Sequence, residues 1–470
     1  NFYLDKQFSP DNTFLVGGDV YAERVRSPAF TFDPVRNTSV PSRPRVPDRA
    51  RYTSYGVYMQ DVYDIIPEAL RLSGALRYNV ASYLSRAANS PLVGAQPLFP
   101  DDSLRVADFS GRLGAVVTPF QDFRIAANYS RGFRAPNITD LGTLGLTGDG
   151  FEVDASSADL LNGTIGTTAG RDAVSTGLRV ERQRSEISNN FDLGFGYRRG
   201  RFETELTGFL IDINSAITKQ ALILPPGAIG RQLGDQTITD QLSNGVVFVP
   251  LSASPVLVRA NYADARLYGF EYEIEGRVAK AWTFGGNFTY VRAKDKATGL
   301  PPNIEGGTPP PAAFLSLRYQ PAAKRYWVEA YSTLARRQTR LSSLDLADRR
   351  TGATRSRTDI ANFFRNGARV RGLVVEGADR LPGTADDVLL ATGETLRQVQ
   401  DRVLGSAAAA PLLPYLPGYG LVNLRGGFRI NENAEVNVAF ENIGDKSYRN
   451  ASWGIDGPGR SVTARLRYRF

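Results

Sequence analysis

Apolar and polar side chains alternate along much of this chain with the two-residue period of a β-strand. In the last ten residues, SVTARLRYRF, the even-numbered positions are apolar and the positions between them are mostly arginine. The segments NFDLGFGYR (190–198) and WTFGGNFTY (282–290) repeat the pattern with polar residues or glycine on the second face. A strand with one apolar and one charged face suits a wall between lipid and a water-filled lumen, although a soluble edge strand is the alternative.

The pattern predicts fourteen strands, and residues 1–8 form a partial fifteenth that turns at 9–12. The fourteen span residues 13–26, 51–65, 70–86, 104–120, 123–136, 188–200, 201–218, 257–278, 281–296, 311–321, 326–341, 419–430, 434–449 and 461–470. Short and long connections alternate strictly, and the longest are about 137–187, 219–255 and 342–418. Short periplasmic turns and long outer loops are the rule for outer-membrane barrels. We therefore expect an all-β, antiparallel transmembrane barrel with long extracellular loops.

Composition narrows the chemistry that this chain can perform. Its 470 residues include no cysteine and no histidine, which excludes disulfides, thiolate or histidine metal sites and histidine-based catalysis. We expect neither an enzyme nor a cofactor. The net charge of +8 comes from arginines scattered over alternate strand positions and loops, without a basic helix, so we expect no nucleic-acid partner. No apolar run approaches the ~20 residues of a spanning helix.

Several segments, taken in order, resemble one known family. They are YGVYMQD (55–61) followed by LSGALRY (72–78), NYSRGFRAPN (128–137), ARLYGFE (265–271), ENIGDKSY (441–448) and GPGR (457–460). The residues that carry the resemblance are Gly132, Phe133, Arg134, Ala135, Pro136, Gly269, Glu271, Asn442, Gly444, Asp445, Tyr448, Gly459, Arg460 and Phe470. In order and spacing, over nearly the whole chain, they are similar to the barrel of TonB-dependent outer-membrane receptors.

The resemblance implies a receptor and active transporter in the outer membrane of a Gram-negative-type bacterium. The cargo would be a scarce, bulky solute: an iron-siderophore-like chelate, cobalamin or an oligosaccharide. Such receptors have about 22 strands and a plug in the lumen. We therefore expect residues 1–470 to be one amino-terminally truncated barrel domain, without the plug. The expected partners are outer-membrane lipid and lipopolysaccharide, the TonB complex through the missing region, and the barrel-assembly machinery through the terminal strand and Phe470.

The motif residues have structural interpretations that we favour over ligand contact. Gly132 and Pro136 end a strand, Asn442 and Asp445 bond local backbone in a bend, and Gly457–Gly459 forms a turn. Ligand contacts are expected in the extracellular loops and the upper lumen, at positions that the sequence does not identify. The loop 137–187, rich in Gly, Thr, Asp and Ser, is predicted to be a mobile surface loop.

Three further features have open interpretations. Glu271, Glu273 and Glu275 fall on one strand face, as a cation path or a carboxylate pair, or as lumen lining that contacts arginines of the plug or of neighbouring strands, which we favour. The loop 377–387 offers Asp379, Asp386 and Asp387 as weak calcium candidates, which Arg380 opposes. Residues 394–410 predict a short helix.

The rival to the receptor is a self-contained passive channel of about fourteen strands. The predicted strand count suits it. The receptor-like segments, the very long loops and a first residue that already lies in a strand oppose it.

Overall fold

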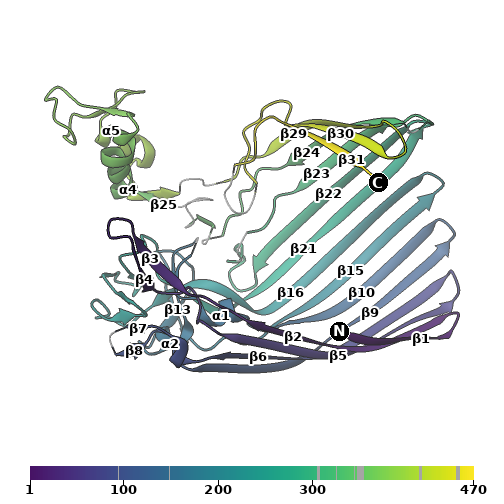
Figure 1. Ribbon diagram of the computed structural model, residues 1–470, viewed down its shortest axis with the longest axis horizontal. Coiled ribbons are helices and arrows are strands. Elements are labelled where there is room, and N and C mark those ends of the chain that lie inside the picture. Colours follow the sequence, from purple (N-terminus) through teal and green to yellow (C-terminus); the bar gives the residue numbers. More distant parts are fainter. Residues whose placement is uncertain are drawn as a thin grey trace.

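The computed structural model describes residues 1–93, 95–147, 149–303, 307–323, 325–342, 345–346, 354–411, 415–450 and 456–469. Fifteen long strands form one antiparallel meander, in which each pairs with the next along the chain (Figure 1). They are β1 (Phe2–Ser9), β2 (Asn12–Arg24), β5 (Arg51–Ile66), β6 (Leu70–Ser85), β9 (Asp102–Phe120), β10 (Phe123–Arg134), β15 (Glu186–Arg199), β16 (Phe202–Ile223), β21 (Leu257–Ala279), β22 (Trp282–Asp295), β23 (Ala312–Tyr319), β24 (Tyr326–Ala335), β29 (Tyr419–Arg429), β30 (Ala434–Glu441) and β31 (Ser461–Tyr468).

The meander confirms the fourteen predicted strands, and the partial fifteenth is a complete strand, β1. Three ends differ from the prediction by five residues or more. β16 continues to Ile223, since its upper end pairs with β21 and with a loop strand. β24 stops at Ala335, and β30 stops at Glu441 because Asn442 takes the left-handed backbone conformation with φ 49° and turns the chain away.

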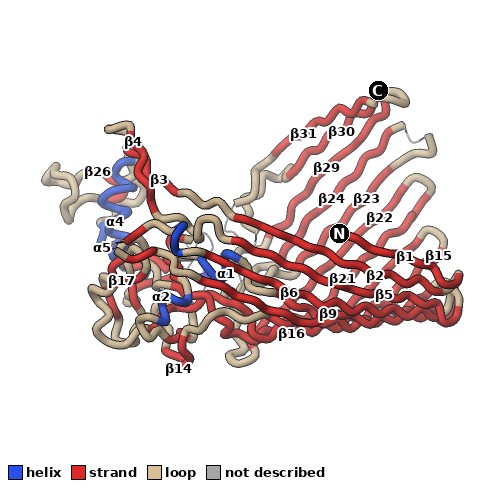
Figure 2. Tube along the Cα trace, turned by 60° about the horizontal axis from the view of Figure 1, so that its bottom comes forward, coloured by secondary structure: helices blue, strands red, loops and turns tan. Residues whose placement is uncertain are grey.

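The sheet curves strongly but does not close (Figures 1 and 2). Within the described residues, β1 pairs only with β2 and β31 only with β30. The predicted barrel is therefore present here as an open, curved wall. No helix among the described residues is long and apolar enough to cross a membrane.

Alternation along the strands gives the wall two distinct faces. Val462 and Leu466 of β31 lie on the convex face with Val438 of β30, whereas Arg465 lies opposite Asn437 on the concave face. Val462 is 63% and Leu466 is 68% exposed. Exposed apolar side chains on a convex strand face are what lipid contact requires, so the concave face is the lumen.

The long connections gather at one end of the wall, opposite the short turns (Figure 1). Their elements are β3 (Ala29–Asp33), β4 (Thr38–Ser42), η1 (Ala87–Asn89), β7 (Leu92–Val93), β8 (Gln96–Pro97), α1 (Ile138–Gly142), β11 (Gly145–Leu146), β12 (Phe151–Val153), α2 (Ala155–Asp159), β13 (Thr164–Gly166), β14 (Ser175–Arg179), β17 (Gln232–Leu233), β18 (Gln236–Thr237), β19 (Asp240–Gln241) and β20 (Val247–Phe248). β12 joins the main sheet parallel to β21, and β13 pairs with β16.

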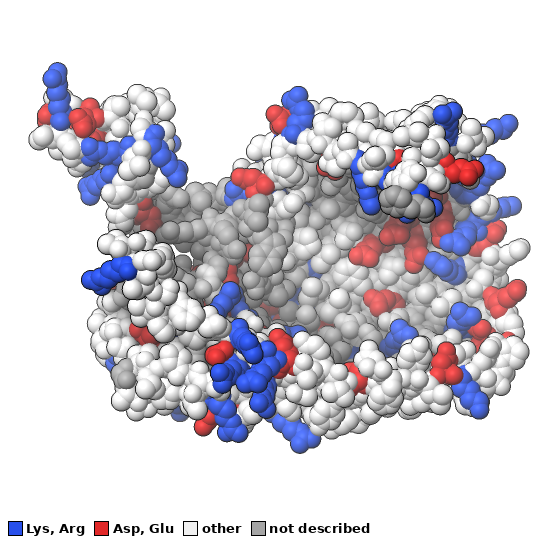
Figure 3. Space-filling model, viewed as in Figure 1, with Lys and Arg blue, Asp and Glu red and all other residues white. Residues whose placement is uncertain are grey.

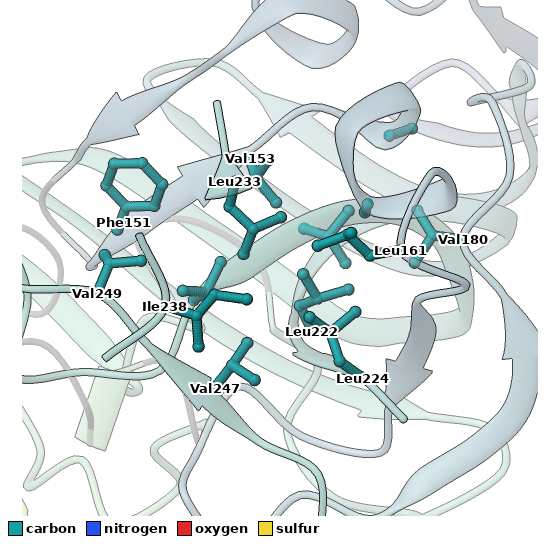
Figure 4. Packing of buried hydrophobic residues seen from close by; sticks show 14 of the residues in the cluster. Phe151, Val153, Leu161, Val180, Leu222, Leu224, Leu233, Ile238, Val247 and Val249 are labelled. Atoms are coloured by element: carbon teal, nitrogen blue, oxygen red, sulfur yellow. The ribbon is translucent and has the colours of Figure 1, made fainter. Parts of the chain in front are cut away.

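These loops pack on a shared hydrophobic core. We call this assembly of loops the cap. Phe151 and Leu161 from the loop after β10 pack with Leu222 at the end of β16 and with Leu233 and Val247 from the loop after it (Figure 4). Phe151, Leu222, Leu233 and Val247 are completely buried. The prediction of a mobile loop at 137–187 was therefore wrong, because its few apolar residues converge with those of a second loop.

The longest loop forms a separate helical unit that stands away from the wall (Figure 1). It contains β25 (Thr354–Ser356), α4 (Arg357–Asn362), a π-helical turn η2 (Phe363–Ala368), β26 (Val374–Val375), β27 (Val388–Leu389), α5 (Leu396–Leu404) and β28 (Ala409–Pro411). The helix predicted at 394–410 is α5, which is shorter because Thr395 caps its start and Gly405, at φ 57°, ends it.

Candidate functional site

A buried network of charges fastens the cap to the wall. Lys219 of β16 forms ion pairs with Asp149 and with Glu152 Oε1, the second at 2.9 Å. Arg259 of β21 bonds Glu152 Oε2 through Nε at 2.8 Å and Asp140 Oδ1 through Nη1 at 3.2 Å. Glu152 is 1% and Lys219 5% exposed. Charges buried this deeply persist only when they are paired, so the network specifies where the cap sits.

Glu152 is ionised in this setting. Burial alone raises the pKa of the Glu152 carboxyl, but attraction to Arg259 and Lys219 outweighs burial and leaves the pKa below its ordinary value. The network thus holds the Glu152 carboxylate charged at neutral pH.

Arg134 extends the network to the next part of the wall. It ends β10, and its guanidinium forms ion pairs with Asp140, at 2.7 Å, and with Glu186 at the start of β15. Asp140 lies in α1, where its side chain also bonds the backbone N–H of Asn137 at 3.1 Å in a capping box. Among the resemblance residues of this segment, Arg134 therefore joins the wall to the cap.

The other residues of that segment have structural roles in β10 and in its connection to α1. A Cβ on Gly132 would lie 2.5 Å from Ser188 Oγ on the neighbouring strand, so the Ser188 side chain occupies the space beside this glycine. Phe133 pairs with Ile187 on the convex face, and Ala135 and buried Pro136 lead from β10 into α1.

The closing hairpin is built around Asn442. Its Oδ1 accepts from the Lys446 N–H at 2.8 Å, and its Nδ2 donates to the Lys446 and Pro458 carbonyls at 2.9 and 3.1 Å. Asp445 Oδ1 accepts from the Arg460 N–H at 2.9 Å. These bonds join the start and the end of the last outer loop across the turn. The bonds between Asn442 and Lys446 are the predicted local ones, whereas Asp445 bonds the backbone of Arg460, 15 residues along the chain.

Tyr448 and the nearby glycines complete that hairpin. The Tyr448 ring lies 4.8 Å from the Tyr419 ring, between centroids, and a Cβ on Gly457 would lie 2.0 Å from a Tyr448 ring carbon. A Cβ on Gly459 would lie 3.0 Å from Asp445 Oδ1, whereas Gly444 has open space beside it. Phe470 lies outside the described residues.

Glutamates line part of the lumen wall. Glu271, Glu273 and Glu275 share the concave face of β21, as predicted, and Glu273 and Glu275 lie directly opposite Glu205 and Glu203 of β16. Figure 3 shows acidic side chains gathered on the concave wall. Arginine partners from the plug or from neighbouring strands were predicted. Within the described residues, none of the three β21 glutamates forms an ion pair with an arginine of a neighbouring strand.

The arginine partners belong to the β16 glutamates instead. Arg124 Nη2 lies 2.6 Å from Glu205 Oε2, and Arg198 Nη2 lies 2.5 Å from Glu203 Oε1. Like charges directly opposite one another on neighbouring strands destabilise a sheet. The β21 glutamates are thus an unneutralised acidic surface that faces the lumen.

The calcium candidates form turn bonds instead of a metal site. Asp386 Oδ1 accepts from Thr384 Oγ1 at 2.7 Å, Asp379 Oδ1 accepts from the Leu381 N–H at 2.8 Å, and Asp387 Oδ2 accepts from the Gly383 N–H at 2.7 Å. Across the described ranges, no group of three or more acidic side chains is placed to hold a metal ion.

Sequence reasoning did not single out Asp140, Glu152, Lys219 or Arg259. One signal was present, since lysine is rare in this chain and Lys219 lies two positions before the apolar run ALIL (221–224). A lone cation beside a buried segment indicates a buried carboxylate partner. Which carboxylate pairs with it depends on how the cap folds.

Comparison with known proteins places this architecture. Residues 1–443 match the family described as TonB dependent receptor-like, beta-barrel. The copper transporter OprC is similar in structure, with a TM-score of 0.61 at 13% identity over 99% of this chain and 55% of that one. The FrpB iron transporter from Neisseria meningitidis, in its apoprotein form, has a TM-score of 0.55 at 12% identity over 100% of this chain and 55% of that one.

The Serratia marcescens hemophore receptor HasR, in complex with HasA and heme, has a TM-score of 0.54 at 13% identity over 100% of this chain and 58% of that one. The comparison with curated proteins finds no match. The chain spans little more than half the length of these solved receptors. The family match confirms the predicted receptor class and the predicted outer-membrane location. Members of this class are transporters and not enzymes, as predicted. The chain belongs to the TonB-dependent receptor β-barrel family of the Gram-negative outer membrane.

Proposed function

We propose that the intact protein is a receptor that imports a bulky metal chelate across the outer membrane with energy from the TonB complex. The observation that carries this proposal is the cap: a folded, charge-fastened assembly at the outer end of the lumen wall. A pre-organised outer surface can hold a large solute before it enters the lumen, because little ordering is left to be done on binding.

The known relatives favour a metal or metal chelate over cobalamin or an oligosaccharide. The similar structures are described as a copper transporter, an iron transporter and a hemophore receptor. Contact with the TonB complex would be made by the receptor's plug region, and the terminal strand β31 would be recognised by the barrel-assembly machinery. Ligand contacts in the loops and upper lumen remain part of this proposal.

The passive channel is the second candidate, and the open wall weighs against it. Within the described residues, β1 and β31 each keep one unpaired edge, which lipid does not tolerate. A self-contained channel would need those edges to pair.

Uptake measurements in the native bacterium separate the two candidates. Deleting the gene should abolish the uptake of a radiolabelled ferric chelate under iron limitation, and a protonophore should abolish it in the wild type. Uptake that persists with the protonophore, together with a native polypeptide of 51.4 kDa, would favour the channel. A control strain deleted for an unrelated porin should keep protonophore-sensitive uptake.

A further inference from the structure

One amine and two carboxylates are enclosed together inside the cap. Lys219 Nζ contacts Asp149 Oδ2 and lies 2.9 Å from Glu152 Oε1. Lys219 belongs to β16, whereas Asp149 and Glu152 belong to the connection between β10 and β15. Lys219 is 5%, Asp149 6% and Glu152 1% exposed, so water has little access to them. We call these three residues the triad.

The strands around the triad are buried and largely apolar. Glu152 lies between Phe151 and Val153 in β12 and pairs with Leu257 of β21. Phe151 is 0%, Val153 2% and Leu257 2% exposed. A charged group in such surroundings loses its hydration, which makes a neutral product more favourable there than it is in water.

The two carboxylates of the triad are held differently. Arg259 Nε lies 2.8 Å from Glu152 Oε2, and a guanidinium at that distance stabilises the charged carboxylate. Glu152 Oε1 faces the Lys219 ammonium instead, where it can accept a proton. Asp149 contacts the same ammonium through Oδ2. A nitrogen in contact with a carboxylate oxygen lies roughly 3–3.5 Å from the carboxyl carbon, which is the separation of a near-attack geometry.

The lysine of the triad is charged before any reaction. Burial alone lowers the pKa of the Lys219 ammonium, but attraction to Glu152 and Asp149 outweighs burial and leaves the pKa above its ordinary value. The free amine therefore arises by proton transfer within the triad and not by loss of the proton to water. Such a transfer turns a buried ion pair into two neutral groups. Enclosure also holds the amine against one carboxyl group, at an effective concentration of about 10⁵ M or more.

We propose that Lys219 and Asp149 condense to a side-chain amide, with Glu152 as the proton carrier. Nζ attacks Asp149 Cγ, and two protons pass from the nitrogen to one carboxyl oxygen by way of Glu152 Oε1. The Nζ–Cγ bond forms, the Cγ–O bond breaks, and one water leaves. An ammonium and a carboxylate together hold all the atoms of an amide and a water, so no oxidant or other reactant is needed. Glu152 ends as it began.

The amide would join the wall to the cap covalently. It links positions 70 residues apart, and a cross-link of that span restricts the unfolded chain. The chain contains no cysteine, so a disulfide cannot provide such a link. Glu152 still pairs with Arg259 after the reaction, so the charge that ties β12 to β21 persists. This modification is independent of the cargo that crosses the lumen.

The test is peptide mapping of the purified full-length receptor, which is unfolded in urea and then digested with trypsin. Without the amide, trypsin cleaves after Lys219 and gives the separate peptides 135–171 and 202–219. Trypsin does not cleave after an acylated lysine. We therefore expect one branched peptide that joins 135–171 to 202–231 and is lighter by one water than the two together. Fragmentation of this peptide shows whether the bond lies at Asp149 or at Glu152.

Two variants and an internal control make the test specific. Lys219→Arg keeps a cation in the network but removes the nucleophile, so it should give no branched peptide. Glu152→Gln keeps the amine and Asp149 but removes the proton carrier, so the branched peptide should form about 100-fold more slowly after refolding. Lys296 Nζ lies 3.7 Å from Asp212 Oδ1, with side chains 30% and 20% exposed. Because water reaches that pair, trypsin should cleave after Lys296 in every sample.

The wild-type receptor decides the outcome, once a heat-modifiable gel shift shows that it is folded. A folded wild type that yields only the peptide ending at Lys219 would overturn the proposal. A branch at Glu152 would overturn the assignment of Asp149 as the acceptor. An unchanged rate of formation in Glu152→Gln would remove Glu152 from the reaction.

Discussion

Arg134 and Asp140 join the wall to the cap, with Nη1 of the arginine 2.7 Å from Oδ2 of the aspartate. Asp140 also receives Arg259 from β21, which is separated from β10 by two strands. One carboxylate, 5% exposed, thus ties the first helix of the loop to two distant strands. The register of the wall fixes the distance between Arg134 and Arg259. Because both arginines bind Asp140, the sheet determines where the cap lies.

Asp140→Ala should release the cap while leaving the wall assembled. It leaves Arg259 partly buried with one carboxylate fewer, and breaking a buried ion pair costs about 3–5 kcal/mol. Limited trypsin digestion of the folded receptor should cut within 137–185 at least tenfold faster, with an unchanged heat-modifiable shift.

The matched control is Asp159→Ala, which breaks an exposed pair with Arg179 in the same loop. Such a pair contributes about 0–1 kcal/mol, so cleavage should change little. Equal cleavage rates for the Asp140 and Asp159 variants would refute the role given to Asp140.

Glu152 should make the cap sensitive to acid. Its pKa lies below the ordinary value, because Arg259 and Lys219 outweigh burial. A carboxyl with a depressed folded pKa contributes stability above its unfolded pKa, about 4.3, and loses that contribution as the pH falls through the folded pKa. The cap should therefore be firm at pH 7 and loosen below about pH 4.

Hydrogen exchange of the segment around β12, corrected for the intrinsic rate, measures this loss between pH 6 and pH 3. Glu152→Gln should exchange fast throughout and show no transition. Glu181→Gln alters an exposed carboxyl of the same loop and should behave like the wild type. A wild-type cap that stays protected to pH 3 would contradict the prediction.

The wall could be predicted from the sequence because its signal is local. Alternation and turn residues place all but three strand ends within two positions, and the strict order of short and long connections gives the meander. The hidden features depend on register between strands far apart in sequence. Glu273 lies opposite Glu205 only because β16 and β21 pair in that register, and the sequence pattern of neither strand predicts the register.

The cap was hidden for a different reason. Its core residues, such as Phe151 and Val247, are scattered without period through two polar loops that are joined only in the fold. A periodic pattern reveals the buried face of one helix or strand, whereas the residues of this core come from several separate segments. The charge network follows the same rule, since Lys219 and Glu152 meet only once the cap has formed.

Asn442→Ala should weaken the closing hairpin. It removes three side-chain hydrogen bonds at a residue 2% exposed, each contributing about 1 kcal/mol, and places alanine at φ 49°. We expect a loss of about 3–4 kcal/mol in the unfolding free energy in detergent, measured by urea titration. Asn366→Ala, which removes one exposed bond to Asn362, should cost less than 1 kcal/mol. Similar losses in the two variants would remove the special role of Asn442.

Gly269 and Gly208 can be compared directly, since they lie on the adjacent strands β21 and β16. They differ in the space that is available for an added Cβ. A Cβ at Gly269 would lie 1.8 Å from the Tyr290 carbonyl oxygen, a backbone atom that cannot rotate away. A Cβ at Gly208 would have no atom nearer than 4.0 Å. Gly269→Ala should therefore force β21 and β22 apart at a cost of about 1–3 kcal/mol or more.

Gly208→Ala should instead stabilise the wall by about 0.5–1 kcal/mol, because glycine in a strand loses more backbone entropy on folding than alanine does. The opposite signs make the comparison decisive, since both changes add one methyl group to neighbouring strands. Urea midpoints of the two folded receptors in the same detergent measure the difference. If both alanine variants shift the midpoint in the same direction, the close approach of β21 and β22 at Gly269 is not what requires glycine there.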